Sequence, residues 1–424
     1  MKRISIRCLV VLGAIAPFIP LATSAAAQAT VVVGTGNPDI DVPAVQAAVD
    51  QSGEVILKGH FSFNRTPTVP TALAGAGYPP ATILVSKAVT ISGEGDGDDM
   101  TTIEGGTIPL YVEAMGAAVT IHALRFVRPQ MGAIVVYAVS GLTIASCKIE
   151  GLVPGPIASK AIDIDTTGNV PLPAQPGRPA NISGTLLIMN NDIDAVGGTA
   201  VDNVLGITVF SAGQSPDNEV DIYVTGNHIK NTTEPAINFR HVGGRVHVEN
   251  NVISTGSISS QQAPGPEVIR VANTGSYVIA HNSIECQWPD PEAKGIGVFS
   301  QIPDWPMVNA FIVDNDVTMS PPPGTVFGAL SAGIGVRAFA QGNVVANNRI
   351  RGRARAALAV NPDRGGIPGN NEFVLNRFDH FEASVADILV GVGVTNTRVI
   401  GQGTVDDHGI GTVIVPLPNF RSQP

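Results

Sequence analysis

Charged and aromatic residues are scarce in this chain of 424 residues: they make up 14% and 5% of it. Hydrophobic residues reach 44%, so the chain can build a core and a disordered protein is excluded. The net charge of −10 leaves no basic surface that would predict a nucleic-acid partner. The 47 Gly and 32 Pro residues follow no three-residue period. They exclude collagen and favour a turn-rich, β-dominated fold.

Cysteine, methionine and histidine are also few. The 3 Cys, 7 Met and 8 His residues form no cluster at metal-ligand spacing. This excludes a structural zinc site and a copper-binding cluster. We expect Cys147 and Cys286 to be buried thiols that fill the core.

The first 29 residues predict a secretory signal peptide. Basic residues precede the apolar run Cys8–Ile19, and small residues lead to the motif Ala27-Gln28-Ala29. The apolar stretch is shorter than a bilayer span and contains Pro17, so cleavage is favoured over an uncleaved anchor. We therefore expect a secreted or periplasmic protein with no membrane span after the signal is removed.

One phrase recurs along the chain. It consists of alternating β-branched residues, a turn residue that is usually Asn, one further residue, and then Ile, Val or Phe. Its shortest spacing is about two dozen residues, a length typical of solenoid repeats. We expect the Asn residues of these copies to stack at one turn: Asn191, Asn227, Asn251, Asn282, Asn315, Asn348 and Asn376.

A second phrase, a small residue followed by Ile-x-Val, precedes the first. Examples are Ala161–Ile164, Gly295–Val298 and Gly333–Val336. Alternation with a period of two predicts short strands, and no window sustains a helical period. A unit this short cannot bury its apolar face alone, so successive units must stack.

The two phrases together resemble the repeat of right-handed parallel β-helix proteins of the pectate-lyase-like superfamily. The resemblance implies an all-β fold: a right-handed parallel β-helix solenoid over residues 30–410, with Asn-ladder turns and a short N-terminal capping helix. The cap is expected over residues 38–58, with Asp41 as a candidate N-cap. Residues 411–424 are expected to form a C-terminal cap or tail. The superfamily contains enzymes and adhesins, so the fold does not select a function.

Insertions lie on both sides of the small-Ile-x-Val strands, whereas the Asn turn never expands. A groove along this strand column is the interpretation we favour, because loops at a shared border tend to carry function. The alternative is drift in loop length without function. Examples of the insertions are Gly151–Lys160, Thr166–Gly184, Ser254–Glu267 and Thr318–Ala332.

Polar side chains occupy the outward positions of these strands, because alternate residues of a strand point to opposite faces. Asp202 is expected in a turn, since Gly206–Phe210 matches Gly295–Phe299 as a strand. Carboxylates at one end and guanidinium groups one to three coils away would form a polarised site. The outward residues are Asp163, Asp165, Asn238, Arg240, Arg270 and Arg337.

This arrangement is similar to that of calcium-dependent pectate lyases, in which acidic calcium ligands lie beside an arginine or lysine base. The resemblance implies Ca²⁺ as the cofactor and arginine as the base or carboxylate clamp, although the local lyase signature is absent. The alternative is a solvated face of alternating charges. The implied calcium ligands are Asp163, Asp165 and Asp202, the implied catalytic residues Arg240 and Arg270, and the further substrate contacts Asn238 and Arg337.

Two other features are candidates for function. Trp288 and Trp305 lie in insertions on opposite borders of the groove, where they could form a sugar-stacking platform or pin their own loops to the solenoid. Asp406-Asp407-His408-Gly409 resembles acid/base residues of pectin-hydrolysing glycosidases. It lies beyond the last expected coil, so a turn is expected there.

The sequence therefore predicts an exported protein that acts on or binds an extracellular polysaccharide. An acidic uronate glycan and lyase- or epimerase-like chemistry in the groove fit the charged column best. The alternative is a non-catalytic surface or periplasmic β-helix that binds glycans or partners through the same loops.

Overall fold

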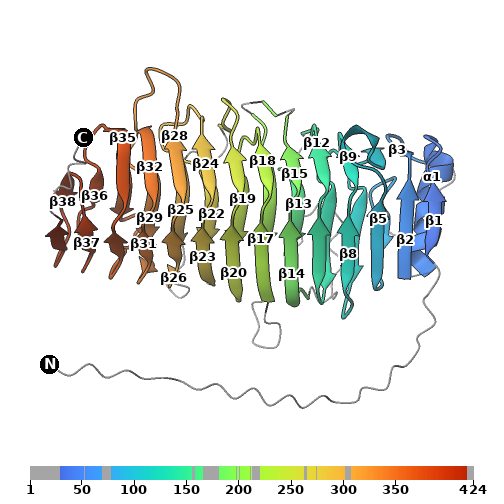
Figure 1. Ribbon diagram of the computed structural model, residues 1–424, viewed down its shortest axis with the longest axis horizontal. Coiled ribbons are helices and arrows are strands. Elements are labelled where there is room, and N and C mark those ends of the chain that lie inside the picture. The colour runs from blue at the N-terminus through green and yellow to red at the C-terminus, as the bar shows by residue number, and fades with distance from the viewer. Residues whose placement is uncertain are drawn as a thin grey trace, which may run out of the picture.

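Parallel strands stack along one axis to form an elongated solenoid (Figure 1). The computed structural model describes residues 29–417 apart from 52, 69–77, 155–157, 166–180, 197, 200, 211, 213–219, 262–264, 274 and 301–306. Residues 1–28 of the expected signal peptide, and Trp305, lie outside the described residues. Among the described residues, no helix is long and apolar enough to cross a membrane.

The described strands form three long sheets, called A, B and C here, in which neighbouring strands pair in parallel. Sheet A contains β1 (Thr30–Val33), β2 (Gly53–Lys58), β5 (Val89–Gly93), β8 (Val119–His122), β11 (Leu142–Ala145), β14 (Gly184–Met189), β17 (Val220–Thr225), β20 (Arg245–Glu249), β23 (Ser276–Ala280), β27 (Phe311–Val313), β31 (Val344–Ala346), β34 (Glu372–Val374), β37 (Arg398–Gly401) and β39 (Val413–Pro416). Sheet B contains β3 (His60–Phe63), β6 (Thr102–Gly105), β9 (Arg125–Val127), β12 (Lys148–Glu150), β15 (Asp192–Asp194), β18 (His228–Lys230), β21 (Val252–Ser254), β24 (Ser283–Cys286), β28 (Asp316–Met319), β32 (Arg349–Ala354) and β35 (Arg377–Ala383). Sheet C contains β4 (Ile83–Val85), β7 (Leu110–Ala114), β10 (Ile134–Val139), β13 (Ser159–Asp165), β16 (Val204–Phe210), β19 (Ile237–Arg240), β22 (Glu267–Ala272), β25 (Lys294–Ser300), β29 (Ala332–Ala338), β33 (Ala356–Asn361), β36 (Ile388–Val390) and β38 (Val405–Asp407).

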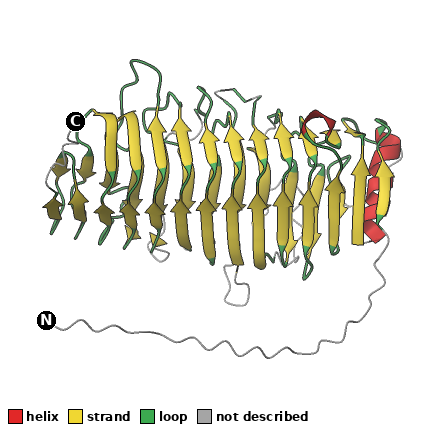
Figure 2. Ribbon diagram, viewed as in Figure 1, coloured by secondary structure: helices red, strands yellow, loops and turns green. Residues whose placement is uncertain are grey.

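Smaller elements complete the described chain. The strands β26 (Met307–Val308) and β30 (Ala340–Gln341) pair with each other, and η1 (Gly97–Asp99) is a short 3₁₀ turn. The helix α1 (Pro38–Gln51) lies at the N-terminal end of the solenoid (Figure 2). The order of strands along each sheet follows the order along the chain, as a parallel β-helix requires.

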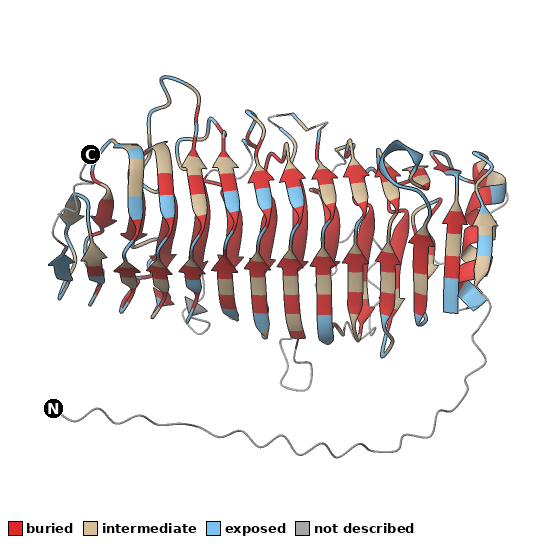
Figure 3. Ribbon diagram, viewed as in Figure 1, coloured by how far each residue is buried: buried red, intermediate tan, exposed pale blue. Residues whose placement is uncertain are grey.

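The core is built by like residues that stack from coil to coil. In sheet A, Ile121 pairs with Ile144, Ile144 with Ile188, and Ile188 with Val224, and all four are fully buried. Figure 3 shows buried residues alternating with more exposed ones along the strands. The small-Ile-x-Val strands predicted from the sequence are those of sheet C, and their Ile and Val side chains are buried.

The Asn ladder predicted from the sequence is confirmed. At the turn between sheets A and B, the side-chain amide of each Asn donates to Oδ1 of the next, over 2.9–3.0 Å. Each Oδ1 also accepts the backbone N–H of the preceding coil's Asn, or of Cys147 at the start of the ladder. A shorter ladder, which the sequence motif did not predict, joins Asn343 to Asn371. The side-chain amide of Asn343 donates to Oδ1 of Asn371 at 2.9 Å.

The N-terminal cap is confirmed as a helix, with one correction. The helix begins at Pro38, and Oδ1 of Asn37 accepts the N–H of Asp39 at 3.1 Å, so Asn37 is the N-cap rather than Asp41. Asp41 is buried inside the helix, where its carboxylate accepts the backbone N–H groups of Thr35 and Ser62. These hydrogen bonds from Asp41 connect the capping helix to the first coil.

The C-terminal end continues the strand pattern. Within the expected cap or tail, β39 adds a strand to sheet A and its four residues are exposed. Asp406 lies in β38, which pairs with β36 in sheet C, so the turn expected at this position is a strand of a further coil. Residues 418–424 lie outside the described part.

The two remaining cysteines behave as expected. Cys147 and Cys286 are free and buried, and burial raises the pKa of both thiols to about 12. Because the thiolate is the reactive form, both side chains act as apolar filling.

Replacing Asn251 by Ala is expected to destabilise the protein by about 3 kcal/mol or more, because several buried donors and acceptors lose their partners. Oδ1 of Asn251 accepts two hydrogen bonds from Asn227, and its amide donates to Val224 and Asn282. Urea unfolding followed by circular dichroism measures the loss. The matched control is Asn250→Gly, because Asn250 is exposed and has a φ of 57° that glycine adopts readily. Equal stability of the two variants would contradict a structural role for the ladder.

Candidate functional site

The outward face of sheet C carries the polar column predicted from the sequence. Asp163 pairs in register with Thr208, Thr208 with Asn238, and Asn238 with Arg270. Asp163 is therefore two coils from Asn238 and three from Arg270, in agreement with the expected separation of carboxylates and guanidinium groups by one to three coils. Gly297 and Gly335 continue this column on the next two strands.

A second outward column runs beside the first. Asp165 pairs with Phe210 and Phe210 with Arg240, and three coils further on Arg337 pairs with Phe299. The Arg337 guanidinium lies over the Phe299 ring, 4.1 Å from the ring centroid, so the aromatic face supports the cation.

These residues are not the solvated face that was the alternative expectation. Asp163, Asn238, Arg270 and Arg337 are between 4% and 7% exposed, and Asp165 is fully buried. The side chains point away from the core but lie against one another, so their charges must be matched locally.

The proposed calcium ligands do not form a calcium site. Lys160 Nζ lies 2.8 Å from Oδ2 of Asp163 and 3.6 Å from Oδ2 of Asp165. The lysine ammonium therefore takes the position between the two carboxylates that a cation would need. Burial raises the pKa of Asp163 to about 6, against the opposing charge of Lys160.

The third proposed ligand, Asp202, is in the turn before β16, as expected. Its carboxylate accepts the hydroxyl of Thr199 at 2.6 Å and the backbone N–H of Thr199 at 2.8 Å, and these bonds lower its pKa. No group of three or more His, Cys, Asp or Glu side chains among the described residues could hold a metal ion. The donor set does not fit Ca²⁺.

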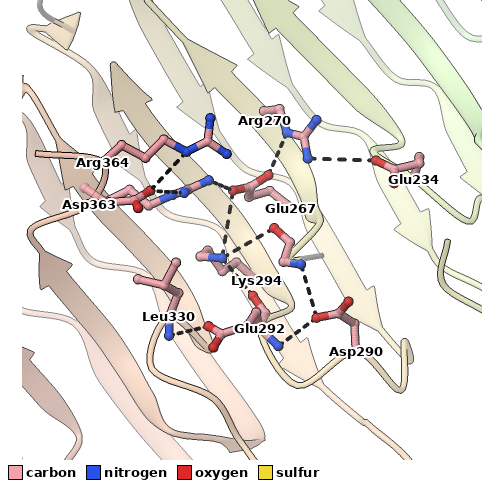
Figure 4. Close-up of polar contacts among 11 residues, drawn as sticks. Glu234, Glu267, Arg270, Asp290, Glu292, Lys294, Leu330, Asp363 and Arg364 are labelled. Atoms are coloured by element: carbon pink, nitrogen blue, oxygen red, sulfur yellow. Dashed lines mark hydrogen bonds and ion pairs between the residues drawn. The ribbon is translucent and has the colours of Figure 1, made fainter. Parts of the chain in front are cut away.

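The centre of the site is Glu267, a residue that the sequence reasoning placed only at a loop end. It is fully buried on β22 and pairs with three cations from three strands (Figure 4). Its Oε2 accepts from Nε of Arg270 at 2.6 Å, its Oε1 pairs with Arg337, and Lys294 Nζ lies 3.9 Å away. Burial alone would raise the pKa of Glu267, but these cations hold it well below its ordinary value.

Two glycines of the outward column make room for this network. A Cβ atom on Gly297 would lie 2.1 Å from Cγ of Glu267, and one on Gly335 would lie 3.1 Å from Cδ of Lys294. Glu267 and Lys294 therefore lie flat across the neighbouring strands. In the sequence, the repeated Gly-Ile-Gly-Val motif was the feature that could have indicated space for these side chains on the outward face.

Lys294 and Asp363 extend the network. Lys294 is 1% exposed and donates to the carbonyl of Glu292 at 2.7 Å, and burial lowers its pKa to about 8. Asp363 pairs with Arg337, with Arg364 at 4.0 Å on its other side. Glu292 in turn accepts the backbone N–H of Leu330, so one connected set of contacts crosses this part of the face (Figure 4).

Glu234 and Arg240 lie at the other edge of the network. Glu234 is 3% exposed, with Nη2 of Arg270 at 3.8 Å, and its Oε1 has no hydrogen-bond partner among the described residues. Burial raises its pKa to about 7, against the opposing charge of Arg270. Arg240 makes no hydrogen bond or close ion pair with the described residues, and burial, then repulsion from Arg270, lowers its pKa to about 10.

Several buried oxygens on or beside the polar column of sheet C have no hydrogen-bond partner in the described part of the chain. Besides Oε1 of Glu234, they include Oδ1 of Asp163, the hydroxyl of Thr208 and Oδ1 of Asn238. Buried polar atoms normally have hydrogen-bond partners, so a row of exceptions on one face points to a place for water or a ligand.

Trp288 does not contribute to an exposed sugar-stacking platform. This residue is fully buried within the main core cluster, and its indole N–H donates to the carbonyl of Thr232 at 2.9 Å. Trp288 therefore pins its own loop to the solenoid. Trp305 lies outside the described residues.

Comparison with known proteins identifies the fold. No family model matches the chain, and no curated protein matches it. PfbA, a surface adhesin of Streptococcus pneumoniae, is 12% identical with a TM-score of 0.54, and the match covers 85% of this chain and 93% of that one. The Dettilon tailspike protein (gp208) is 11% identical with a TM-score of 0.50, over 91% of this chain and 68% of that one. At such identities the likeness shows a right-handed parallel β-helix and no more.

Gly297→Ala is expected to destabilise the protein by about 3 kcal/mol or more, because the new Cβ forces Glu267 away from its buried cations. The control is Gly256→Ala, where the nearest atom would be 3.5 Å from the new Cβ. The free energy of unfolding in urea compares the two. A Gly297→Ala protein as stable as the control would show that Glu267 does not need this space.

The pH dependence of stability tests the state of Glu234. Because folding raises its pKa from 4.5 to about 7, its stabilising contribution is complete below the unfolded pKa and is lost as pH rises through 7. Glu234→Gln lacks this titration, so between pH 5 and pH 8 it should gain about 2–3 kcal/mol relative to the wild type. Urea unfolding at both pH values measures the difference. Glu54→Gln, at an exposed position, is the control and should follow the wild type.

Proposed function

We propose that this exported protein binds an acidic polysaccharide along the outward face of sheet C and removes the proton next to the carboxylate of a uronate unit. One observation carries the proposal: Arg240, a partly buried cation without an ion-pair partner among the described residues, lies in the electrostatic field of Glu234, a carboxyl group with a pKa of about 7. A carboxylate ligand would supply the missing partner of Arg240.

The chemistry follows from these two groups. The sugar carboxylate pairs with Arg240, and Oε1 of ionised Glu234 accepts the proton from the adjacent C5–H bond. The electron pair of that bond moves into the carboxylate, and the cationic surroundings stabilise the resulting enediolate. Return of a proton to the opposite face of C5 gives the epimer. Alternatively, cleavage of the C4–O bond, with protonation of the leaving oxygen, gives an unsaturated sugar.

The structure changes the roles inferred from the sequence. Arg270 is held between Glu267 and Glu234, so it is a fixed cation and a poor base. Glu234 is the better proton acceptor, because its pKa lies near neutrality. Arg240 keeps the proposed role of carboxylate clamp.

The alternative is a non-catalytic binding protein. The near-complete burial of Glu234 and Glu267, and the internal pairing of Arg270, Lys294 and Arg337, favour a structural use of these charges. In that case the same face would bind a glycan without turnover. The similarity in fold to a surface adhesin supports this alternative only as an analogy.

An activity screen separates the two. The mature chain is incubated with polygalacturonate, alginate and a neutral glucan, with and without a calcium chelator. Unsaturated products are read by ultraviolet absorbance and epimerised units by NMR. We expect turnover of a uronate polymer that persists in the chelator, with kcat/KM rising as pH passes through about 7 because Glu234 must be ionised.

Variants assign the roles. Glu234→Gln should lower turnover at least about a hundredfold with binding retained. Arg240→Met should weaken binding of the acidic polymer at least about tenfold and leave neutral glucan unaffected. Arg245→Met, at an exposed arginine that pairs with Asp221 on sheet A, is the control and should match the wild type. Binding that depends on Arg240 without any product would establish the non-catalytic alternative. Absence of both binding and product would refute the proposal.

A further inference from the structure

A separate hollow lies further along sheet C, toward the C-terminal end of the solenoid. Its volume is about 360 Å³, within the range of small-molecule sites. Its lining includes Leu330, Arg355, Asn361, Leu389, Asp406 and His408.

The hollow is continuous with the face already described. Asn361 pairs in register with Arg337, and Leu389 and Asp406 lie on the next two strands of sheet C. Leu330 lines the hollow, and its backbone N–H donates a hydrogen bond to the carboxylate of Glu292, which holds it in place. The hollow therefore begins one coil beyond the network of Glu267.

Arg355 stands out among the arginines near it. It follows β32, where Arg349 pairs with Asp379, Arg351 pairs with Asp316, and Arg353 donates to the carbonyls of Pro321 and Pro322. Arg355 makes no hydrogen bond or ion pair with the described residues, and its Nε is buried without a partner. A partly buried guanidinium in this state lacks an anion.

The other groups of the hollow point to a polyhydroxylated ligand. Nε2 of His408 lies 3.0 Å from Oδ1 of Asp406, and both side chains are partly exposed. The free lone pairs of Asp406 can accept hydroxyl groups, which disfavours a highly charged anion at the same place. Leu330 and Leu389 supply apolar surface for the C–H face of a ring.

We propose that this hollow binds one carboxylated sugar unit, with Arg355 on the carboxylate and the Asp406–His408 pair on the hydroxyl groups. The class of ligand rests on the proposed function, but the hollow is a binding site distinct from Glu234 and Arg240. The unit is either a free uronate or part of a polymer that lies along sheet C. Both sources present the same chemistry.

Calorimetric titration of the mature chain with sodium galacturonate, sodium guluronate, their tetrasaccharides and glucose tests the proposal. Arg355→Met should weaken binding of at least one acidic ligand by about tenfold or more and leave glucose unchanged. Arg355→Lys keeps the charge but loses the planar fork, so it should fall between Arg355→Met and the wild type. Arg349→Met, at an exposed arginine paired with Asp379, is the matched control and should bind as the wild type does. Thermal unfolding of each variant verifies that it is folded.

The outcomes also separate this site from the proposed catalytic one. A loss for free uronate in Arg355→Met assigns a monosaccharide site, and a loss confined to the tetrasaccharides assigns a subsite for the polymer. The Arg355→Met titrations do not depend on turnover, so failure of the catalytic proposal does not remove this site. Wild-type affinity of Arg355→Met for every acidic ligand would overturn the inference, as would equal losses of binding in Arg355→Met and in the control Arg349→Met.

Discussion

The hydrogen bond between successive turn asparagines is the constraint on which the rest of the molecule depends. From Asn191 to Asn376, each side chain satisfies donors of the coil before it, both from the side chain and from the backbone. A slip of one residue in any coil would break these bonds and turn the apolar side chains outward. Because the register cannot drift, outward residues that are far apart in the chain fall into straight columns on sheet C.

The charges on that face obey the rule that a buried ion needs a counter-ion. Lys160 is the counter-ion of Asp163 and Asp165. Glu267 is the counter-ion of three cations: Arg270, Arg337 and Lys294. Among the described residues, Arg240, at the end of β19 in sheet C, and Arg355, just before β33, have no ion-pair partner. Two cations without ion-pair partners in the described part of an acidic protein are more simply explained by an anionic ligand than by chance.

The fold could be predicted because its signals are local and repeated. The Asn phrase gave the turn, and the small-Ile-x-Val phrase gave the strands of sheet C and the register of Asp163, Asn238 and Arg270. The burial of these residues could not be predicted, because it depends on side chains that lean along the axis onto neighbouring coils.

The centre of the site was missed for the same reason. Glu267 reaches Arg337 across two coils and 70 residues, a contact that no local pattern reveals. The sequence left two roles open for Trp288, and the structure shows the pinning role, because the insertion folds the ring inward to the carbonyl of Thr232. Position within the repeat predicts the direction of a strand side chain and says little about an inserted loop.

The ion pair between Glu267 and Arg337, which spans two coils, limits how the solenoid can change its length during evolution. A solenoid gains or loses whole coils easily, because each coil contacts only its neighbours and a new Asn turn joins the ladder without other adjustment. Between β22 and β29 this freedom is lost, since Glu267 meets Arg337 only with the glycine-containing coil of β25 between them. Duplication or deletion of that coil would leave a buried carboxylate or guanidinium unmatched. Proteins descended from this chain can therefore gain coils before β22 or after β29. The number of coils between these two strands stays fixed.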